Sequence, residues 1–406
     1  MIHSIEVSNF RCLRQIQQRM DPFNILVGPN GSGKSAFMDA IAFLSDFLKM
    51  GLDAVGKRSA NFYDLFWKGE GNRFDIAVEL AIPAELKGRV GKSYTRARGQ
   101  IEFCRYEVGI GIIDRSRELG IVHEAFRLRT ARPRWTRAEI PDLDEAPGTG
   151  WQLVICKHPE GLEDRYSAET WTWGTGFYLG PKRSALANLP GDEEKFPVAV
   201  WFKKMLLEGI HHIEINPAQL RSPSPPLREK NVTPLPWIVE ELSKKHPELL
   251  GEWIAHLQVV LPDLKGIASI DRPEDRYRYL MLEFANGTRL PSWMVSDGTL
   301  RMLALTVLAY IPGLQGIYLI EEPENGIHPR ALHAVMDSLS SVYESQVFVA
   351  THSPIVLGLA RPENILCFSK DAEGATSILR GAEHPKLRDW QGQPTFDVLF
   401  ASGILG

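Results

Sequence analysis

The sequence predicts an α/β fold: a mixed or parallel sheet with a flanking antiparallel β layer and an inserted helical subdomain. Three observations lead to this fold class. A short apolar stretch at 23–27 runs into a glycine-rich loop and then into a helical pattern over 36–50. From residue 292 onward helical and strand patterns alternate, which is typical of a parallel sheet. Between these parts, three segments alternate apolar and polar side chains as half-buried strands do: 75–82, 100–109 and 120–128.

The remaining elements follow from the same periodicities. Further strands are expected at 2–7, 171–179 and 211–215, and amphipathic helices at 196–208 and 237–261. Asn286-Gly287 is a hairpin turn dipeptide, so the residues on either side of it, over 279–290, should pair as two strands. The stretches 132–150 and 221–236 are rich in turn-forming residues, the second with five prolines, and are expected to be loops.

Composition indicates the compartment. The 406 residues include four scattered cysteines with no C-x-x-C pair, which argues against a disulfide framework and against a structural zinc site. The first residues lack the basic and apolar regions of a signal peptide. No stretch approaches the roughly 18 uninterrupted apolar residues of a membrane span. The chain is therefore expected to be cytoplasmic, with no membrane partner.

The glycine-rich loop at 28–35 fits the phosphate-binding pattern G-x-x-x-x-G-K-[ST] at every fixed position. A strand before it and a helix after it are the context in which this pattern binds phosphate, because backbone N–H groups and the helix N-terminus point at the anion. Lys34 is expected to reach the β- and γ-phosphates, and the Ser35 hydroxyl to ligate Mg²⁺. The loop therefore predicts a nucleoside triphosphate site, with contacts from Asn30, Gly31, Ser32, Gly33, Lys34 and Ser35.

Two strands in the last part of the chain end in residues suited to phosphate hydrolysis. The apolar strand at 316–320 ends in Glu321-Glu322-Pro323-Glu324, and the strand at 347–350 ends in Thr351-His352. In an α/β protein, the carboxyl end of a buried strand is where paired carboxylates support Mg²⁺ chemistry. One carboxylate can hold the metal and its water shell while the next polarises the attacking water. His352 is expected to reach the γ-phosphate or that water.

A second group of small residues, Ser296-Asp297-Gly298-Thr299, precedes a helix expected at 300–310. Taken alone, these residues are the N-cap of a helix. The same arrangement is also a second anion site, because a helix N-terminus presents free N–H groups and a positive dipole end. The position of this segment, before the acidic strand and the histidine strand, favours the second interpretation.

In the order of these motifs the sequence resembles the ABC-type ATPases of the RecF/SMC class. Their order is phosphate loop, signature motif, acidic strand, D-loop and switch histidine. The resemblance implies that Ser296, Asp297 and Gly298 belong to the signature, in a less common wording. It implies that the nucleotide is ATP, that Glu321 holds Mg²⁺ in place of the usual Asp, and that Glu322 is the general base. His352 would be the switch, and residues 324–329 the D-loop.

The resemblance extends to the N-terminus, where Asn9-Phe10-Arg11 is similar to a motif whose basic residue approaches the nucleotide. Arg11 is therefore an expected nucleotide contact. No glutamine is assigned to the glutamine loop of this class, and residues 179–183 are the segment nearest to its expected place.

Within this class, the run Glu-Glu-Pro-Glu-Asn-Gly-Ile-His-Pro-Arg is most similar to predicted AAA-family ATPases akin to the ATPase half of OLD-type nucleases. OLD nucleases carry a C-terminal Toprim domain, and only 54 residues follow His352, so that domain is not expected here. The resemblance then implies a separate, nuclease-like effector protein and a role in bacterial anti-phage defence.

The resemblance also implies a homodimer or a higher even-numbered assembly. Two copies would pack head to tail, with ATP between the phosphate loop of one and the signature of the other, and hydrolysis would loosen the pair. Three domains are expected on this basis. They are a nucleotide-binding lobe with the β layer at 1–185, a helical insert at 186–290, and at 291–406 the signature, acidic strand and histidine of the same ATPase core.

Three other functions share parts of this pattern. The nucleotide-binding subunit of a transporter would use the same motifs, but 260 residues between Ser35 and Ser296 are a long insert for that role. An SMC-like DNA repair or structural ATPase would need a long coiled coil, and no sustained heptads are present. A small-molecule kinase shares the phosphate loop but needs neither the signature nor the histidine.

Positive charge is concentrated between Lys87 and Arg137, where thirteen Lys or Arg stand against five acidic residues. The segment therefore carries +8, and the remainder of this −4 chain carries −12. On a β layer beside the nucleotide lobe, Arg127, Arg129 and Arg132 are expected to bind DNA without sequence preference. Two alternatives stay open: a solvated β surface without a ligand, and a docking face for an acidic partner protein.

Overall fold

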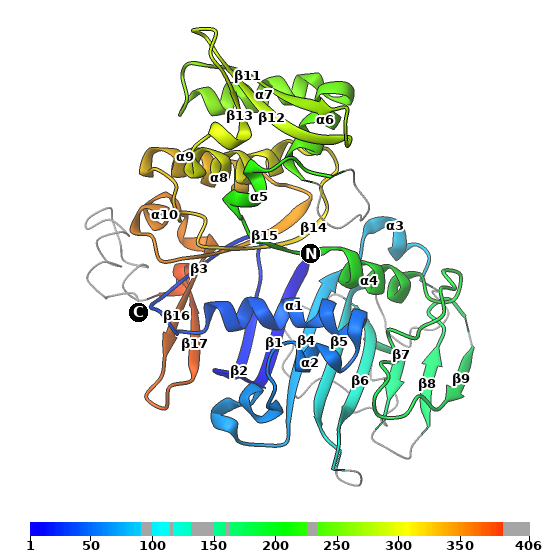
Figure 1. Ribbon diagram of the computed structural model, residues 1–406. Coiled ribbons are helices and arrows are strands. Elements are labelled where there is room, and N and C mark those ends of the chain that lie inside the picture. The colour runs from blue at the N-terminus through cyan, green and yellow to red at the C-terminus, as the bar shows by residue number, and fades with distance from the viewer. Residues whose placement is uncertain are drawn as a thin grey trace. The chain divides into compact units, whose positions relative to one another are not determined.

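The computed structural model describes residues 1–90, 100–113, 117–130, 150–158, 163–171, 173–225 and 234–384 (Figure 1). Contacts within the chain group it into two units. The first unit comprises Met1–Asp21, Asn30–Ile210 and Phe368–Ile378, and the second comprises Pro22–Pro29, His211–Cys367 and Leu379–Gly406. None of the helices in the described ranges combines the length and the apolar character that a bilayer span requires.

The first unit is built on an eight-stranded sheet in the order β2-β1-β4-β5-β6-β7-β8-β9, whose neighbours are antiparallel (Figure 1). Helices α1 (Lys34–Met50) and α4 (Pro197–Glu208) pack aromatic rings on one face. Phe43 of α1 contacts Phe74 with ring centroids 5.3 Å apart, and Phe202 of α4 contacts Phe126 at 5.0 Å. The strands are β1 (Ile2–Phe10), β2 (Leu13–Arg19), β4 (Arg73–Ala81), β5 (Ile101–Ile112), β6 (Leu119–Thr130), β7 (Trp151–Lys157), β8 (Asp164–Ser167) and β9 (Gly174–Phe177).

This sheet confirms the predicted antiparallel layer. The strands expected at 75–82, 100–109 and 120–128 are β4, β5 and β6, with small shifts of their bounds. Strand β2 was not predicted, because its buried residues Leu13, Ile16 and Gln18 are unevenly spaced and one of them is polar, so the sequence shows no apolar alternation. The strand expected at 171–179 is limited to β9, and residues 132–149 of the expected loop lie outside the described residues. Short helices α2 (Asp53–Gly56) and α3 (Ala84–Lys87) complete the unit.

The second unit contains the strands that carry the acidic residues and the histidine. They belong to a six-stranded sheet in the order β10-β14-β15-β3-β16-β17, in which β14, β15, β3 and β16 are parallel. The strands predicted at 23–27, 316–320 and 347–350 are confirmed. The bounds are β3 (Phe23–Val27), β10 (Ile210–Ile213), β14 (Gly316–Glu321), β15 (Ser345–Thr351), β16 (Ile365–Lys370) and β17 (Thr376–Arg380), with helices α8 (Asp297–Thr306), α9 (Pro329–Ser340) and α10 (Pro354–Leu359).

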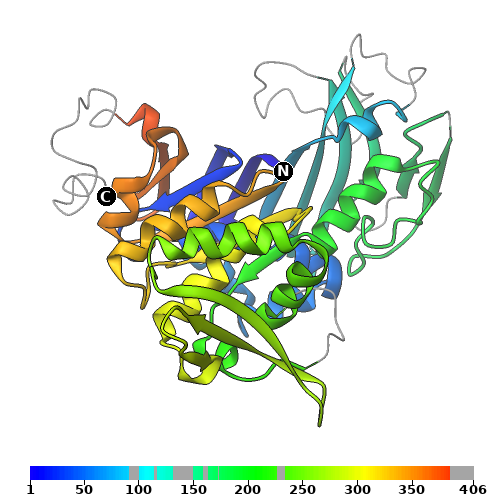
Figure 2. The same cartoon turned by 90° about the horizontal axis from the view of Figure 1, so that it is seen from above.

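The inserted part of the second unit combines helices with a three-stranded sheet. One helix was expected at 237–261, but the structure has α6 (Leu235–Lys245) and α7 (Pro247–Gln258), because Pro247 has no N–H to continue the helix past His246. Both helices lie along one face of the sheet β11-β12-β13, as Figure 2 shows. The predicted hairpin is confirmed by β12 (Tyr277–Phe284) and β13 (Arg289–Pro291), and the remaining elements are α5 (Pro217–Arg221) and β11 (Leu264–Arg272).

Two of the three arginines expected to bind DNA, Arg127 and Arg129, are not exposed. Arg129 and Arg127 have side chains only 4% exposed, and Arg132 lies outside the described residues. Arg129 forms a bidentate pair with the fully buried Glu79, at 2.5 and 2.6 Å, and Arg127 pairs with Glu107. Although burial alone opposes ionisation, the neighbouring Arg127 and Arg105 lower the pKa of Glu107. These arginines neutralise carboxylates of the same sheet and are not available to a DNA phosphate.

Arg129→Ala is expected to destabilise the fold strongly. The substitution leaves the Glu79 carboxylate buried without its partner, which costs about 3–5 kcal/mol of the free energy of unfolding. Arg89→Ala is the matched control, since Arg89 is largely exposed and 3.9 Å from Glu193, and its loss should cost less than about 1 kcal/mol. Urea unfolding of both variants measures the difference. Equal stability losses would show that the Arg129–Glu79 pair has no special role.

Candidate nucleotide site

The phosphate loop connects β3 to α1, and its glycines adopt backbone conformations that other residues disfavour. Gly31 and Gly33 have φ of 74° and 109°, in the left-handed region that side chains disfavour. Gly33 is the N-cap of α1, so the helix begins at Lys34. Ser32 and Lys34 are buried, while Asn30, Gly31 and Ser35 are exposed. The loop thus presents the start of α1 to an anion, as its sequence predicts.

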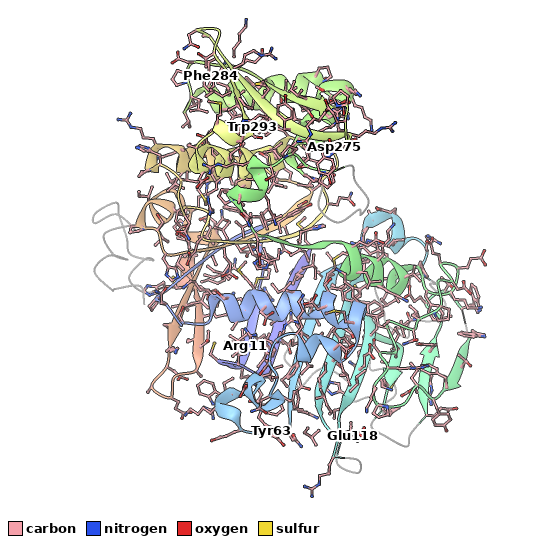
Figure 3. The ribbon with its side chains drawn as sticks, in the orientation of Figure 1. Arg11, Tyr63, Glu118, Asp275, Phe284 and Trp293 are labelled. Carbon is pink, nitrogen blue, oxygen red and sulfur yellow. The ribbon has the colours of Figure 1, made fainter. Side chains whose placement is uncertain are left out.

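Arg11 lies in the turn between β1 and β2 and is labelled in Figure 3. Its backbone has φ of 53°, and its N–H donates to the Leu65 carbonyl at 2.7 Å. Its guanidinium pairs with Asp39 of α1 at 3.0 Å, one turn after Lys34, and Asp39 also holds Arg58 at 2.8 Å. Arg11 therefore lies on the flank of the helix that carries the phosphate-loop lysine, and the sequence did not indicate Asp39 as its partner.

Glu322 and His352 lie together at one edge of the six-stranded sheet. The register pairs Glu321 with Ala350 and Thr351 with Val27, so β14, β15 and β3 end side by side. Glu322 Oε1 is 3.9 Å from His352 Nε2. Glu322 has φ of 46°, a conformation that costs about 1–3 kcal/mol and is concentrated at functional sites. Its N–H donates to the Ala350 carbonyl at 2.8 Å, and Asn325 Nδ2 donates to its carboxylate.

Glu324 is a neighbour that the sequence did not single out within the expected D-loop. Its Oε1 accepts a hydrogen bond from the Thr351 hydroxyl at 2.6 Å and another from the His352 N–H at 3.0 Å. Its Oε2 is buried and has no hydrogen-bond partner among the described residues. Glu324 therefore ties the acidic turn to the backbone that carries His352.

The segment that resembles the signature is an N-cap by geometry. Ser296 Oγ accepts a hydrogen bond from the Thr299 N–H at 3.2 Å, and Asp297 pairs with Arg221 at 2.8 Å. Ser296 and Asp297 are both exposed. A Cβ on Gly298 would lie 2.4 Å from the Gly326 carbonyl oxygen, so this position requires glycine where α8 meets the expected D-loop.

Two protein-family models match the chain. One described as "AAA domain, putative AbiEii toxin, Type IV TA system" matches residues 160–358, and one described as "AAA ATPase domain" matches residues 1–105. An OLD nuclease of Thermus scotoductus is 22% identical over 400 residues, which are 95% of this chain and 65% of that protein. A solved SMC head bound to the C-winged helix domain of ScpA has the same fold, with a TM-score of 0.55, 15% identity and coverage of 93% of this chain and 97% of that one.

This chain is similar to AAA-family ATPases in sequence and has the fold of an SMC head. The ABC-type fold expected from the sequence is thus confirmed, and the expected resemblance to AAA-family ATPases and OLD nucleases is found. Structural maintenance of chromosomes protein 1 of Schizosaccharomyces pombe is 38% identical over 68 residues, 16% of this chain and 5% of that protein. The chain spans 65% of the length of the OLD nuclease relative.

The residues expected to hold Mg²⁺ have donor atoms that suit this ion. The Ser35 hydroxyl and the carboxylates of Glu321 and Glu322 are hard oxygen donors, the ligands that Mg²⁺ selects. Among the described residues no three His, Cys, Asp or Glu side chains form a metal site of their own. Mg²⁺ usually takes one or two protein ligands and completes its shell with phosphate and water. His212 Nε2 lies 3.8 Å from Glu321 Oε1 and is a second neighbour that the sequence did not indicate.

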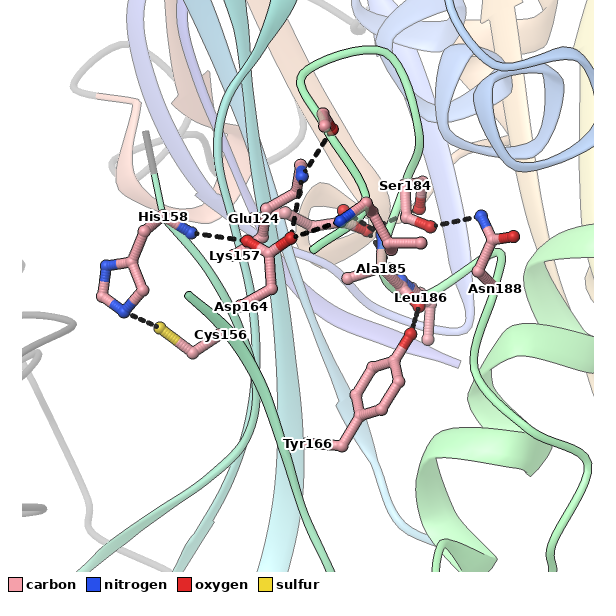
Figure 4. Close-up of polar contacts among 12 residues, drawn as sticks. Glu124, Cys156, Lys157, His158, Asp164, Tyr166, Ser184, Ala185, Leu186 and Asn188 are labelled. Carbon is pink, nitrogen blue, oxygen red and sulfur yellow. Dashed lines mark hydrogen bonds and ion pairs between the residues drawn. The ribbon is translucent and has the colours of Figure 1, made fainter. Parts of the chain in front are cut away.

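Two buried carboxylates hold the segment nearest to the expected glutamine loop (Figure 4). Asp164 accepts hydrogen bonds from the Leu179 N–H at 3.1 Å and from Lys157, which also donates to the Gly180 carbonyl. Burial raises the pKa of Glu124, whose oxygens accept from the Ser184 hydroxyl and from the N–H groups of two following residues. The network fixes this segment to the β sheet, and no glutamine lies in it.

Proposed function

We propose that this chain hydrolyses ATP with Glu322 as the general base. The observation that carries the proposal is the strained Glu322 backbone, which holds the carboxylate 3.9 Å from His352. Both residues follow the carboxyl ends of β14 and β15, and β15 pairs with β3, the strand that precedes the phosphate loop. Lys34 would bind the β- and γ-phosphates, and Ser35 and Glu321 would hold Mg²⁺, which would neutralise charge on the phosphates. Glu322 would take a proton from the attacking water, with His352 orienting that water or the γ-phosphate.

The proposal extends to a dimer in which each site is shared. Two copies would meet head to tail, so that Ser296 and Gly298 of one copy face the ATP on the phosphate loop of the other. The exposed Ser296 at the start of the ten-residue helix α8 supports this, because a helix N-terminus presents N–H groups and a positive dipole end that favour an anion. ATP would then hold the two copies together, and its hydrolysis would release them.

The biological role follows from the relatives only by analogy. One matching family model is named for a type IV toxin–antitoxin system and one relative is an OLD nuclease, so an ATP-controlled nuclease-like effector in anti-phage defence is the role we propose. DNA as a direct ligand stays a prediction. Any contact with it would use basic residues other than the buried Arg105, Arg127 and Arg129.

Lys34→Ala tests nucleotide binding directly. Removing the ammonium that faces the β- and γ-phosphates should weaken ATP binding by about 100-fold, the loss of two charge-assisted hydrogen bonds. Lys49→Ala is the matched control, because Lys49 is exposed in the last turn of the same helix. Calorimetric titration with ATP and Mg²⁺ measures both. Wild-type affinity in the Lys34 variant would refute the assignment of the loop.

A further inference from the structure

Thr376, at the start of β17, contacts the phosphate loop from the C-terminal part of the chain. Its hydroxyl donates to the Ser32 carbonyl at 2.8 Å, and its N–H donates to the Cys12 carbonyl at 2.9 Å. Thr376 is buried, with 5% of its surface exposed. Since Ser32 is itself buried, this hydrogen bond satisfies a loop carbonyl that water does not reach. Thr376 therefore holds both the loop and the turn next to Arg11.

Strand β17 packs so closely on the phosphate loop that no side chain fits at Gly33. A Cβ on Gly33 would lie 2.2 Å from Thr376 Oγ1 and 3.1 Å from Cys12 Sγ. Gly33 is thus required by its positive φ and also by the approach of β17. The shape of the loop depends on a strand more than 340 residues later in the sequence.

Lys370, at the end of β16, places a second ammonium beside the same loop. A Cβ on Gly31 would lie 3.8 Å from Lys370 Nζ. Gly31 is exposed and belongs to the part of the loop whose backbone N–H groups cradle phosphate. Lys370 is exposed, and its side chain forms no ion pair with another described residue. A cation in this position gains a partner when a phosphate group occupies the loop.

The turn between β16 and β17 also borders a pocket. This pocket has a volume of about 540 Å³, within the range of ligand sites, and lies within the first unit. Its lining includes Glu373 of the turn together with Asn9, Arg14, Trp67 and Lys68. Asn9 and Arg14 flank the Cys12 that contacts Thr376. The turn of the strand pair thus lines a pocket of ligand size, while Thr376 contacts the phosphate loop.

We propose that Phe368–Ile378 is part of the nucleotide site. Thr376 holds the phosphate loop in its binding shape, and Lys370 supplies a second cation to the bound phosphates. The inference rests on the proposed function, because it requires a nucleotide on the loop. It adds that the loop is completed by a strand pair that follows the switch histidine in the sequence.

Lys370→Ala tests the second cation. We expect ATP and ADP to bind about tenfold more weakly, with a smaller dependence of affinity on salt than in the wild type, because one charge–phosphate interaction is lost. Lys370→Arg should restore the affinity, and Lys49→Ala should leave it unchanged. Wild-type affinity in Lys370→Ala, or an equal loss in Lys370→Arg, would overturn the role of this charge. Lys34→Ala in the same titration separates this result from failure of the nucleotide site itself.

Thr376→Val tests the hold on the loop, since valine keeps the shape and removes the hydroxyl. The Kd for ATP and the KM should rise about fivefold, as loss of one hydrogen bond implies, while kcat stays near the wild-type value. Thr376→Ser should restore both constants. If Thr376→Val binds ATP as tightly as the wild type while Lys34→Ala does not bind, the loop does not depend on β17.

Discussion

Glu322→Gln is expected to bind ATP as tightly as the wild type and to lose nearly all hydrolysis. Glutamine keeps the size of the side chain and an oxygen that can accept the Asn325 hydrogen bond, but it cannot accept a proton from water. The turnover number should fall by about a hundredfold to ten-thousandfold, the usual contribution of a general base. Single-turnover and steady-state phosphate release, with ATP affinity measured in parallel, give the two constants separately.

The control for this substitution lies at the opposite end of the neighbouring strand. Glu344 is exposed just before β15 begins, so Glu344→Gln removes the same charge from the same sheet without reaching the carboxyl edge. It should hydrolyse ATP at the wild-type rate. Comparable turnover in Glu322→Gln and the wild type would remove Glu322 as the base.

Ser296→Arg is expected to abolish hydrolysis while each chain still binds ATP. Ser296 is exposed at the start of α8, so a long cation fits the single chain but blocks a second copy from approaching the cap. Loss of the cap itself should cost only about 1 kcal/mol of stability. Turnover, ATP affinity and the melting temperature together distinguish a blocked interface from an unfolded helix.

Asn216→Ala is the matched control for the loss of a cap. Asn216 accepts a hydrogen bond from the Ala218 N–H at 3.0 Å and caps α5 in the same unit. Its variant should lose a similar amount of stability and keep its turnover. Normal hydrolysis by Ser296→Arg would show that this residue is a helix cap and nothing more.

The sequence predicted best those strands whose apolar pattern is followed directly by phosphate-binding or acidic residues. The strand over 23–27, the loop that follows it and the acidic strand at 316–320 could all be predicted from the sequence. A short apolar run that ends in a glycine-rich loop or in paired carboxylates is typical of a buried strand of an α/β sheet. The ABC-type fold followed from the order of these motifs. The long antiparallel layer was also predicted, except for β2, whose sequence shows no apolar alternation.

The contacts that complete the site could not be predicted, because they join residues far apart in the chain. Arg129 belongs to a strongly basic segment, yet Glu79, fifty residues earlier, neutralises it on the neighbouring part of the sheet. Composition records charge but not pairing. Thr376 and Ser32 are 344 residues apart, and no local pattern marks a threonine that holds a phosphate loop. Such residues become visible only when the topology brings the strands together.

The most direct test of the shared site mixes two inactive chains. Lys34→Ala keeps an intact signature and Ser296→Arg keeps an intact phosphate loop, so a mixed dimer contains one complete site. At equal amounts at most about a quarter of the wild-type turnover should return, because at most half of the dimers are mixed and each has one of two sites intact. Mixing Lys34→Ala with Glu322→Gln should restore nothing, since both residues would serve the same half of a site. Equal turnover in the two mixtures, whether absent or present in both, would contradict the head-to-tail dimer.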